Sequence, residues 1–369
     1  MKKNFLALSF ALGAALILAT FSSARAQNQC ADLWLGIGKN VVVTSLHHQH
    51  GPILKYQADP VLRGPGKNSY RIGTYNMLNL YDHVAPQVNG SQRQYSLIKD
   101  DSRRRGNAQA IELMDSDIQV LVEVENLAAL KRFTSSYLKD QYQPFLIDGN
   151  DGRGIDVAVL VKRNLPIEFE WRSYKKVNNS QGRPVFSRDL PVGLVYERDS
   201  TGQRSEKPRF AILATHYKSQ RAQRGEEHLT ALKREEQARA TVQIVDQIRR
   251  EFGEDLPVFL AGDFNNQVHS SPEFRSLYEY GFKDTLDMLP AEKIPTDRAT
   301  HYYFPRSGPP HANQIDAILA LGTNIRVVDG EIVSDRDQAG NILPAPTSYA
   351  ERETRPSDHR PIVVEVELP

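Results

Sequence analysis

Short apolar runs bounded by turn residues recur from about residue 70 to the C-terminus. Runs of this length predict β-strands, and two longer segments have apolar residues at helical spacing. The helical stripes are Ala108, Ile111 and Met114, and then Leu229, Leu232, Val242, Val245, Ile248 and Phe252. The predicted strands are Arg71–Tyr75, Ile118–Val122, Val157–Val161, Val192–Tyr196, Phe210–Thr215, Pro257–Ala261, Ile315–Leu321 and Pro361–Leu368. No long linker divides them, so the pattern predicts one α/β domain over residues 70–369.

The N-terminus has a different pattern. Lys2 and Lys3 precede an apolar stretch, Phe5–Phe21, which is followed by small residues up to Ala26. This order predicts a secretory signal peptide over residues 1–26, cleaved near Ala26, although an uncleaved anchor has the same basic start. We therefore expect a secreted protein, periplasmic or extracellular, without a stable membrane anchor after cleavage. Residues 27–69 are polar and contain Gly and Pro, and we interpret them as an extended lead-in segment.

Charge and cysteine content exclude several classes of protein. The 46 Lys and Arg residues against 45 Asp and Glu give a net charge of +1, and loss of residues 1–26 would leave 43 against 45. Affinity for nucleic acid would therefore have to come from a local patch or from a metal rather than from the global field. Cys30 is the only cysteine, which excludes an intramolecular disulfide and a thiolate zinc cluster.

Polar residues lie at the ends of the predicted strands. Four strands end on such residues, and three others begin with them. If the second group runs antiparallel to the first, all of these side chains meet at one edge of the packed sheets, where loops leave room for a substrate. The strand ends carry Asn76, Glu123, His216, and Asp263 with Asn265, and the strand starts carry Asp156, Asp316, and Asp358 with His359.

These residue types favour phosphoester chemistry. Carboxylate and amide oxygens are ligands of hard divalent cations, so we expect Mg²⁺, with Mn²⁺ and Ca²⁺ as alternatives. Together with His216 and His359 they could offset the charge of a phosphodiester, align a water and assist the leaving oxygen. Each of these residues, taken alone, could also have a purely structural role. Glu125 is an alternative to Glu123 as the metal ligand, and Asp156 has the weakest evidence for a functional role.

Six segments carry a resemblance to a known family. They are GTYNMLN at 73–79, IQVLVEVEN at 118–126, ATHYKS at 214–219, AGDFNN at 261–266, QIDAIL at 314–319 and PSDHRPI at 356–362. In these segments the chain resembles the endonuclease/exonuclease/phosphatase (DNase I-like) superfamily, in particular its secreted bacterial nucleases. That group also includes neutral sphingomyelinases and inositol-polyphosphate phosphatases. The resemblance implies an α/β fold, a four-layer sandwich of two packed mixed β-sheets flanked by helices.

The same resemblance implies a role for each residue at the strand ends. Glu123 would be the main metal ligand, assisted by Asn76, and Asp358 would bind the same metal or a second one. Asp263 would align and deprotonate the attacking water. The remaining residues would act on the phosphate: Asn265 by a hydrogen bond, His359 oriented by Asp316, and His216 with Asp156 as its partner. In the AGDFNN segment, Asn266 stands where many relatives have Asp.

Basic and aromatic residues near these motifs bear on the substrate. Lys218, Arg221 and Arg360 are candidates for contacts with substrate phosphate, and Tyr302 and Tyr303 could stack on a base or pack against the edge. We expect a divalent-metal-dependent nuclease that hydrolyses DNA, RNA or both, with nucleic acid as its partner. The alternatives are a phosphodiesterase or phosphatase acting on phospholipid or another small phosphoester, and a non-catalytic binding protein. The sequence shows no aromatic membrane-contact hairpin of the sphingomyelinase type.

Overall fold

The computed structural model describes residues 54–57, 68–84, 99–221 and 225–369. The predicted signal peptide, Cys30 and most of the predicted lead-in segment lie outside the described residues. Among the described residues, no helix has the length and apolar character needed to cross a membrane.

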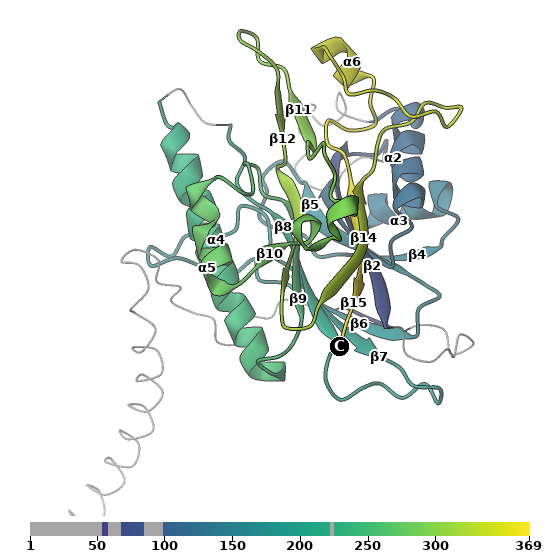
Figure 1. Ribbon diagram of the computed structural model, residues 1–369, viewed down its shortest axis with the longest axis vertical. Helices are drawn as coiled ribbons and strands as arrows, with labels where there is room; N and C mark the ends of the chain where they lie inside the picture. The colour runs from purple at the N-terminus through teal and green to yellow at the C-terminus, as the bar shows by residue number, and fades with distance from the viewer. Residues whose placement is uncertain (1–53, 58–67, 85–98, 222–224) are drawn as a thin grey trace, which may run out of the picture.

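Two β-sheets form the centre of the molecule (Figure 1). One has seven strands in the order β1-β6-β7-β8-β9-β13-β10: Leu54–Gln57, Ile167–Arg172, Val192–Glu197, Phe210–His216, Val258–Asp263, Asp316–Leu321 and Lys283–Asp284. The other has six strands in the order β14-β15-β2-β3-β5-β4: Arg326–Ile332, Ile362–Glu367, Ser69–Leu80, Ile118–Val124, Asp156–Lys162 and Tyr142–Leu146. A separate two-stranded hairpin consists of β11 (His301–Tyr303) and β12 (His311–Asn313).

Helices cover the outer faces of both sheets. In Figure 1, α4 (Glu227–Phe252) and α5 (Arg275–Tyr280) lie on the left, and α2 (Asp101–Met114) and α3 (Leu127–Tyr137) lie on the right. The short helix α6 (Tyr349–Glu353) and the 3-10 turns η2 (Pro272–Phe274), η3 (Thr285–Met288) and η4 (Ala291–Lys293) lie in connecting segments. The predicted four-layer α/β sandwich is therefore confirmed.

The period-2 alternation of the strands divides the core into three clusters. Phe210, Ile212 and Ala214 of β8 point towards the other sheet, while Ala211 and Leu213 face α4. The same alternation in the six-stranded sheet sends one set of side chains inward and the other towards α2 and α3. The central strands thus bury both of their faces, which explains why the predicted strands are mainly apolar runs rather than alternating ones.

All eight predicted strands and both predicted helices are present, and the directions of the strands are as expected. β2 runs parallel to β3, and β8 runs parallel to β9. β5, β13 and β15 are antiparallel to their neighbours β3, β9 and β2. The strand ends and strand starts that carry the polar residues therefore meet at one edge of the sandwich.

Two expectations from the sequence are wrong in detail. Residues 54–57 of the predicted lead-in form β1, which pairs with β6, so the sheet includes chain that precedes residue 70. Leu229 and Leu232 are 48% and 56% exposed, because the buried face of α4 runs instead through Thr230, Arg234, Gln237 and Ala238. The apolar stripe predicted for this helix is buried only in its C-terminal half.

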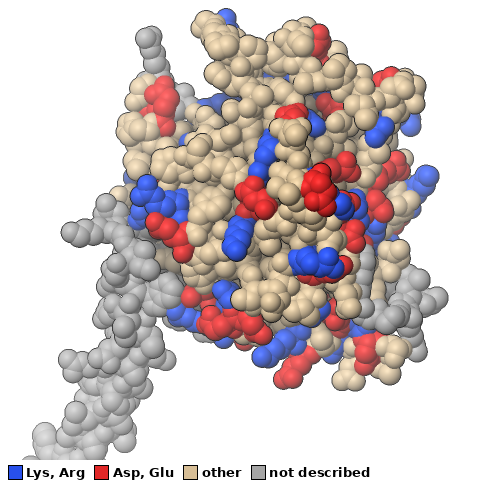
Figure 2. Space-filling model, viewed as in Figure 1, with Lys and Arg blue, Asp and Glu red and all other residues tan. Residues whose placement is uncertain are grey.

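Charged residues of both signs are interspersed on the face shown in Figure 2. The basic residues there do not form a broad field, which agrees with the balanced charge of the sequence. Attraction of a polyanion would then depend on groups close to the site itself.

Candidate active site

Three neighbouring strands carry polar residues in a single row. Asp263 at the end of β9 pairs in register with His216 of β8 on one side and with Asp316 of β13 on the other. Each of these residues continues the inward-facing series of its strand, after Ala214 and Ala261 and before Ile318. The same alternation that builds the core therefore directs the three polar side chains into the space between the sheets.

The opposite sheet contributes Asn76 and Glu123. Asn76 continues the inward series of β2, and its Nδ2 donates to Asp263 Oδ2 at 3.0 Å. Simple alternation would put Glu123 on the outer face of β3 with Leu121. The register shifts between Val122 and Val124, and Glu123 has φ of 63°, so the chain turns at this residue. Its Oε1 lies 3.8 Å from His216 Nε2, because the irregularity has re-aimed the side chain into the site.

Left-handed backbone conformations concentrate at this edge. Eight non-glycine residues of the described chain have positive φ, and four of them lie here: Leu78, Asn79, Glu123 and Asn265. Such conformations cost free energy and persist where the surroundings hold them, commonly at functional sites. Asn79 shows one such restraint, since its backbone N donates to Glu123 Oε2 at 3.1 Å.

His359 and Asp316 form a buried pair. Nδ1 of His359 lies 2.8 Å from Asp316 Oδ2, and its Nε2 faces Asn76 Nδ2 at 3.4 Å and Asp263 Oδ2 at 4.0 Å. Burial opposes protonation of the ring, but the charge and hydrogen bond of Asp316 raise the pKa of His359 well above its usual range. The Thr300 hydroxyl accepts from the backbone N of Asp316 at 3.1 Å and fixes the start of β13.

Asp263 lies at the centre of the cluster. Its carboxylate accepts from the backbone N of Asn265 at 2.7 Å, from the Asn265 side chain at 3.2 Å and from Asn76 at 3.0 Å. Burial raises the pKa of Asp263 to about 7. The Asn265 amide also donates to Tyr217 O at 3.1 Å. Both amide hydrogens of Asn265 are therefore engaged, so as placed this side chain orients Asp263 and is not free to donate to a phosphate.

The expected pairing of His216 with Asp156 is wrong. Asp156 occupies an outward position of β5, in the series of Ala158, and accepts from Gly149 N at 2.7 Å. His216 Nδ1 is buried and makes no hydrogen bond within the described part of the chain. Burial, with the nearby Arg188, lowers the pKa of His216 well below its usual range. His216 is thus a neutral ring, in contrast to His359.

Asp358 is held by residues that the sequence analysis did not identify. His301 Nε2 lies 3.7 Å and Arg352 Nη1 3.8 Å from Asp358 Oδ2. Burial opposes ionisation, but His301 and the charge of His359 hold the pKa of Asp358 well below its usual range. The sequence does hold a signal for His301, because this residue directly precedes Tyr302 and Tyr303, which the sequence analysis placed near the substrate. No motif of the sequence analysis includes Arg352.

Lys99 and Ser357 fix the loop that carries Asp358 and His359. The buried Lys99 ammonium donates to Met77 O, to Asn107 Oδ1 at 3.0 Å and to Pro356 O at 2.7 Å. Burial lowers the pKa of Lys99 to about 7. Ser357 Oγ donates to Asn76 O at 2.7 Å and accepts from His359 N at 3.1 Å. These bonds join the C-terminal part of β2 to the loop that carries Asp358 and His359.

The basic residues predicted to contact phosphate differ in their placement. Arg360 is already engaged, since its guanidinium donates to Asp297 Oδ2, Ala299 O, Tyr302 OH, Ile332 O and Ser334 Oγ. It is an anchor for the surrounding chain, and its predicted contact with phosphate is not supported. Lys218 is half-buried beside Gln237, and Arg221 is exposed. These two remain candidates.

Solved structures with a similar fold can now be compared. An endonuclease/exonuclease/phosphatase from Bacteroides vulgatus has a TM-score of 0.53 at 17% identity, covering 82% of this chain and 100% of its own. A family protein from Bacteroides thetaiotaomicron has a TM-score of 0.51 at 18% identity, covering 82% and 98%. The chain has the endonuclease/exonuclease/phosphatase fold. TDP2 from D. rerio, solved with a single-strand DNA product, shares this fold with a TM-score of 0.51 at 14% identity, covering 82% of this chain and 100% of its own. No family model matches the sequence, and no curated protein matches it significantly.

The edge of this endonuclease/exonuclease/phosphatase fold has the donor set of a divalent-cation site. Asp358 Oδ1 is buried and makes no hydrogen bond among the described residues, and His359 Nε2 lies 3.8 Å from it, beyond hydrogen-bond distance. A buried carboxylate oxygen without a donor is costly unless a cation or water satisfies it. Glu123 offers a second carboxylate directed into the site, so the two carboxylates fit a hard cation. Asn76 Oδ1 already accepts from Leu78 N at 2.9 Å and has one further lone pair to offer.

Three compact groups of His and Asp side chains could hold a metal within the described chain. Two lie at this edge and share His359: one adds His301 and Asp358, the other Asp263 and Asp316. Glu123 belongs to neither, so its role as a ligand stays a prediction. In the third group, His269 with Asp284 and Asp287, both carboxylates are already paired with Arg298, which lies 2.9 Å from Asp284 Oδ2 and also contacts Asp287. We interpret that group as an ion-pair network.

His269 provides a test of that interpretation through pH. Its hydrogen bond with Asp284 raises the pKa of His269, although burial opposes the shift. A raised folded-state pKa stabilises the fold fully below the unfolded value of about 6.5, and this contribution is lost as pH rises through the folded value. Replacing His269 with Gln should therefore lower the free energy of unfolding by roughly 0.5–1 kcal/mol at pH 5.5 and by less at pH 8.5. Urea unfolding at the two pH values measures this difference, and an equal loss at both would contradict it.

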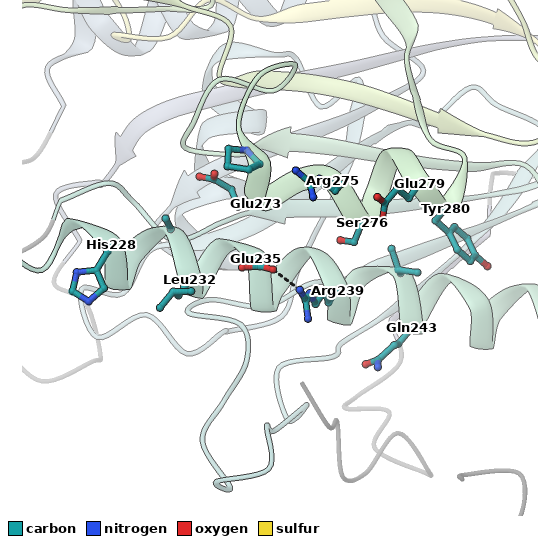
Figure 3. A pocket seen from close by; sticks show the side chains of 13 residues that line it. His228, Leu232, Glu235, Arg239, Gln243, Glu273, Arg275, Ser276, Glu279 and Tyr280 are labelled. Atoms are coloured by element: carbon teal, nitrogen blue, oxygen red, sulfur yellow. Dashed lines mark hydrogen bonds and ion pairs between the residues drawn. The ribbon is translucent and has the colours of Figure 1, made fainter. Parts of the chain in front are cut away.

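A groove of about 810 Å³ lies away from this edge, between α4 and α5 (Figure 3). Leu232, Glu235 and Arg239 line it from α4, and Arg275 and Glu279 from the facing helix. Its side chains contain none of the predicted catalytic or metal-binding residues. The groove is therefore separate from the chemistry of the site.

Proposed function

We propose that the protein is a divalent-cation-dependent phosphodiesterase, most specifically a secreted nuclease that hydrolyses DNA, RNA or both. The observation that carries this proposal is the buried Asp316–His359 pair placed beside Asp263 and Asn76, between the two sheets of this fold. Similar folds in endonuclease/exonuclease/phosphatase proteins support the reaction class. Secretion is proposed from residues 1–26 alone.

The proposed roles follow from what each side chain faces. Asp263 is held by three donors, and its Oδ2 lies 3.6 Å from His216 Nε2, so it is placed to orient a water and accept its proton. His359, fixed through Nδ1 by Asp316, directs Nε2 towards the same space, where it donates to a phosphate oxygen. His216 is neutral and supplies a hydrogen bond without adding charge.

The proposed cation is held by Glu123 and Asp358, with Asn76 as a further oxygen donor. When bound, it supplies charge neutralisation for the phosphodiester and its leaving oxygen. The two carboxylates come from the same sheet, Glu123 near the end of β3 and Asp358 before β15, with β2 between these strands. Their positions relative to each other are therefore set by the pairing of β3 and β15 with β2.

Nucleic acid is proposed as the substrate over small phosphoesters. TDP2 from D. rerio was solved with a single-strand DNA product, and it shares this fold over 82% of the chain. Lys218 and Arg221, directly after His216, supply positive charge next to the site. A local patch of this kind suits a chain whose overall charge is balanced.

The experiment is a parallel assay of the purified full chain with Mg²⁺, Mn²⁺ or Ca²⁺. Plasmid DNA, RNA, sphingomyelin and bis(4-nitrophenyl) phosphate are incubated separately, with EDTA as the control. Cleavage of either nucleic acid, lost in EDTA, is the expected result. Cleavage of sphingomyelin alone would make the protein a phospholipid phosphodiesterase, and absence of all cleavage with every cation would favour the binding-protein alternative.

A further inference from the structure

A hairpin rises from the edge of the sandwich beside the candidate site. β11 and β12 pair antiparallel, with His301 opposite Asn313 and Tyr303 opposite His311, and they project at the top of Figure 1. An isolated bridge joins His301 to His359, so the base of the hairpin adjoins the reactive histidine. The strands β11 and β12 are not among those predicted from the sequence.

The hairpin carries a series of rings that begins at His359. The ring centroids of His359 and His301 are 4.7 Å apart, and those of His301 and Tyr303 are 6.5 Å apart with an angle of 20° between the planes. Tyr303 and His311 continue the series across the strands, at 6.4 Å and 8°. Period-2 alternation places His301 and Tyr303 on one face of β11, and directly opposed residues share a face, so the rings form one surface.

The rings pass from buried to exposed along this series. His359 is buried, His301 is half-buried, Tyr303 is 50% exposed and His311 is exposed. The nearly parallel rings of Tyr303 and His311 are exposed, and His301 links them to the buried ring of His359. A ligand bound at His359 could therefore contact their aromatic surface. Aromatic faces of this kind are what single-stranded nucleic acids stack on.

The opposite face of the hairpin fixes its position. Tyr302 alternates to that face, where its hydroxyl lies 3.3 Å from Arg360 Nη1 and donates to Asp297 at the same distance. Arg360 also donates to Ala299 O at 3.1 Å, and its backbone N donates to Thr300 O. The ring surface is therefore held by a polar network on its far side, which reduces the entropy lost when a ligand binds.

The residues at the tip of the hairpin favour a nucleobase over a membrane as the ligand. In the loop between the two strands, Phe304 and Pro305 are half-buried, and residues 306–310, Arg-Ser-Gly-Pro-Pro, are exposed. The exposed part of the tip thus presents a cation and small side chains, without a large apolar side chain to enter a bilayer. The aromatic surface lies instead along the side of the hairpin, on the path that leads to His359.

We propose that Tyr303 and His311 form a stacking subsite for a nucleobase attached to the phosphodiester that is bound at His359. This inference rests on the proposed function and narrows it to substrates that have an unstacked base beside the cleaved linkage. Single-stranded nucleic acid meets that requirement, because its bases are free to stack on a protein ring. A duplex would have to release a base first.

The test compares a labelled single-stranded hexanucleotide with the same length of abasic (tetrahydrofuran) chain. Binding to the full-length protein is measured by fluorescence anisotropy in EDTA, so that it does not depend on catalysis. Tyr303→Leu should weaken binding of the base-containing strand by about fivefold to 100-fold and leave the abasic strand within twofold of wild type. Tyr303→Phe should restore binding of the base-containing strand, because it keeps the ring.

The outcomes separate this inference from the proposed function. Equal weakening for both strands, or none, would overturn the stacking subsite, as would loss of phosphatidylcholine vesicle binding in Tyr303→Leu with oligonucleotide binding unchanged. A wild-type protein that binds the base-containing strand through Tyr303 but cleaves no phosphodiester with any cation would support the subsite and refute the nuclease. His311→Ala provides a second variant, expected to weaken only base-dependent binding.

Discussion

Replacing His359 with alanine is expected to lower kcat for phosphodiester cleavage by about 10²–10⁴-fold. The ring lies between Asp316, 2.8 Å from Nδ1, and Asp263, 4.0 Å from Nε2, so no other side chain of the site can take its place. Steady-state rates on a single-stranded oligonucleotide, with saturating Mg²⁺, measure the loss.

The control for this experiment is a second histidine with a similar carboxylate contact. His269 Nε2 lies 3.0 Å from Asp284, yet it belongs to an ion-pair network outside the site, so His269→Gln should keep near-normal turnover. Removing His359 also leaves the buried Asp316 without its partner, which destabilises the fold. His359→Gln supplies an amide donor, and both variants are checked by thermal unfolding. Near-normal turnover in a folded His359 variant would remove this residue from the mechanism.

The continuous strands of the fold were predictable because they are buried on both faces. Ile118–Val122 and Phe210–Thr215 are mainly apolar runs in which only Gln119 and Thr215 are polar, and each lies between two packed layers. The missed strands are less regular: β4 contains Pro144, and β14 alternates with charged residues because one face is exposed. Their place in the sheet depends on neighbours far away in the sequence, which no local pattern encodes.

In the site, too, some features could be predicted from local sequence patterns and others could not. Strand order and direction bring His216, Asp263 and Asp316 into one row, and the sequence predicted that meeting point. A shift of one residue in the strand register turns a side chain at the strand end to the opposite face of the sheet. Asp156 is therefore turned to the outer face, while the irregularity at Glu123 turns that carboxylate inward. A β-bulge of this kind leaves no clear signal in one sequence.

Arg360 illustrates a further limit. Its position directly after His359 suggested contact with phosphate, but its guanidinium is satisfied by five acceptors of the surrounding chain. The identity of a basic residue fixes its charge and its donors. Only the fold determines whether those donors are already used, and here they anchor the hairpin that carries Tyr303.

Replacing Glu123 with glutamine is expected to weaken binding of the divalent cation by at least about tenfold and to raise the Mg²⁺ concentration needed for half-maximal cleavage by a similar factor. The substitution keeps the shape of the side chain but removes a negative charge that a hard cation requires. The backbone N of Asn79 can still donate to the amide oxygen, so the strained turn at this residue is retained. Cation binding is measured directly with Mn²⁺ by electron paramagnetic resonance, which does not depend on turnover.

Glu125 is the matched control, because it lies two residues further along and differs in what it contacts. Its carboxylate accepts from Asp82 N at 3.1 Å, and burial raises the pKa of Glu125. Glu125→Gln keeps an acceptor for Asp82 and should leave Mn²⁺ affinity within twofold of wild type. If Glu125→Gln weakens cation binding and Glu123→Gln does not, the ligand has been assigned to the wrong carboxylate. The bulge at Glu123 would then serve only the fold, since the inward turn of its side chain is the structural reason for choosing it over its neighbour.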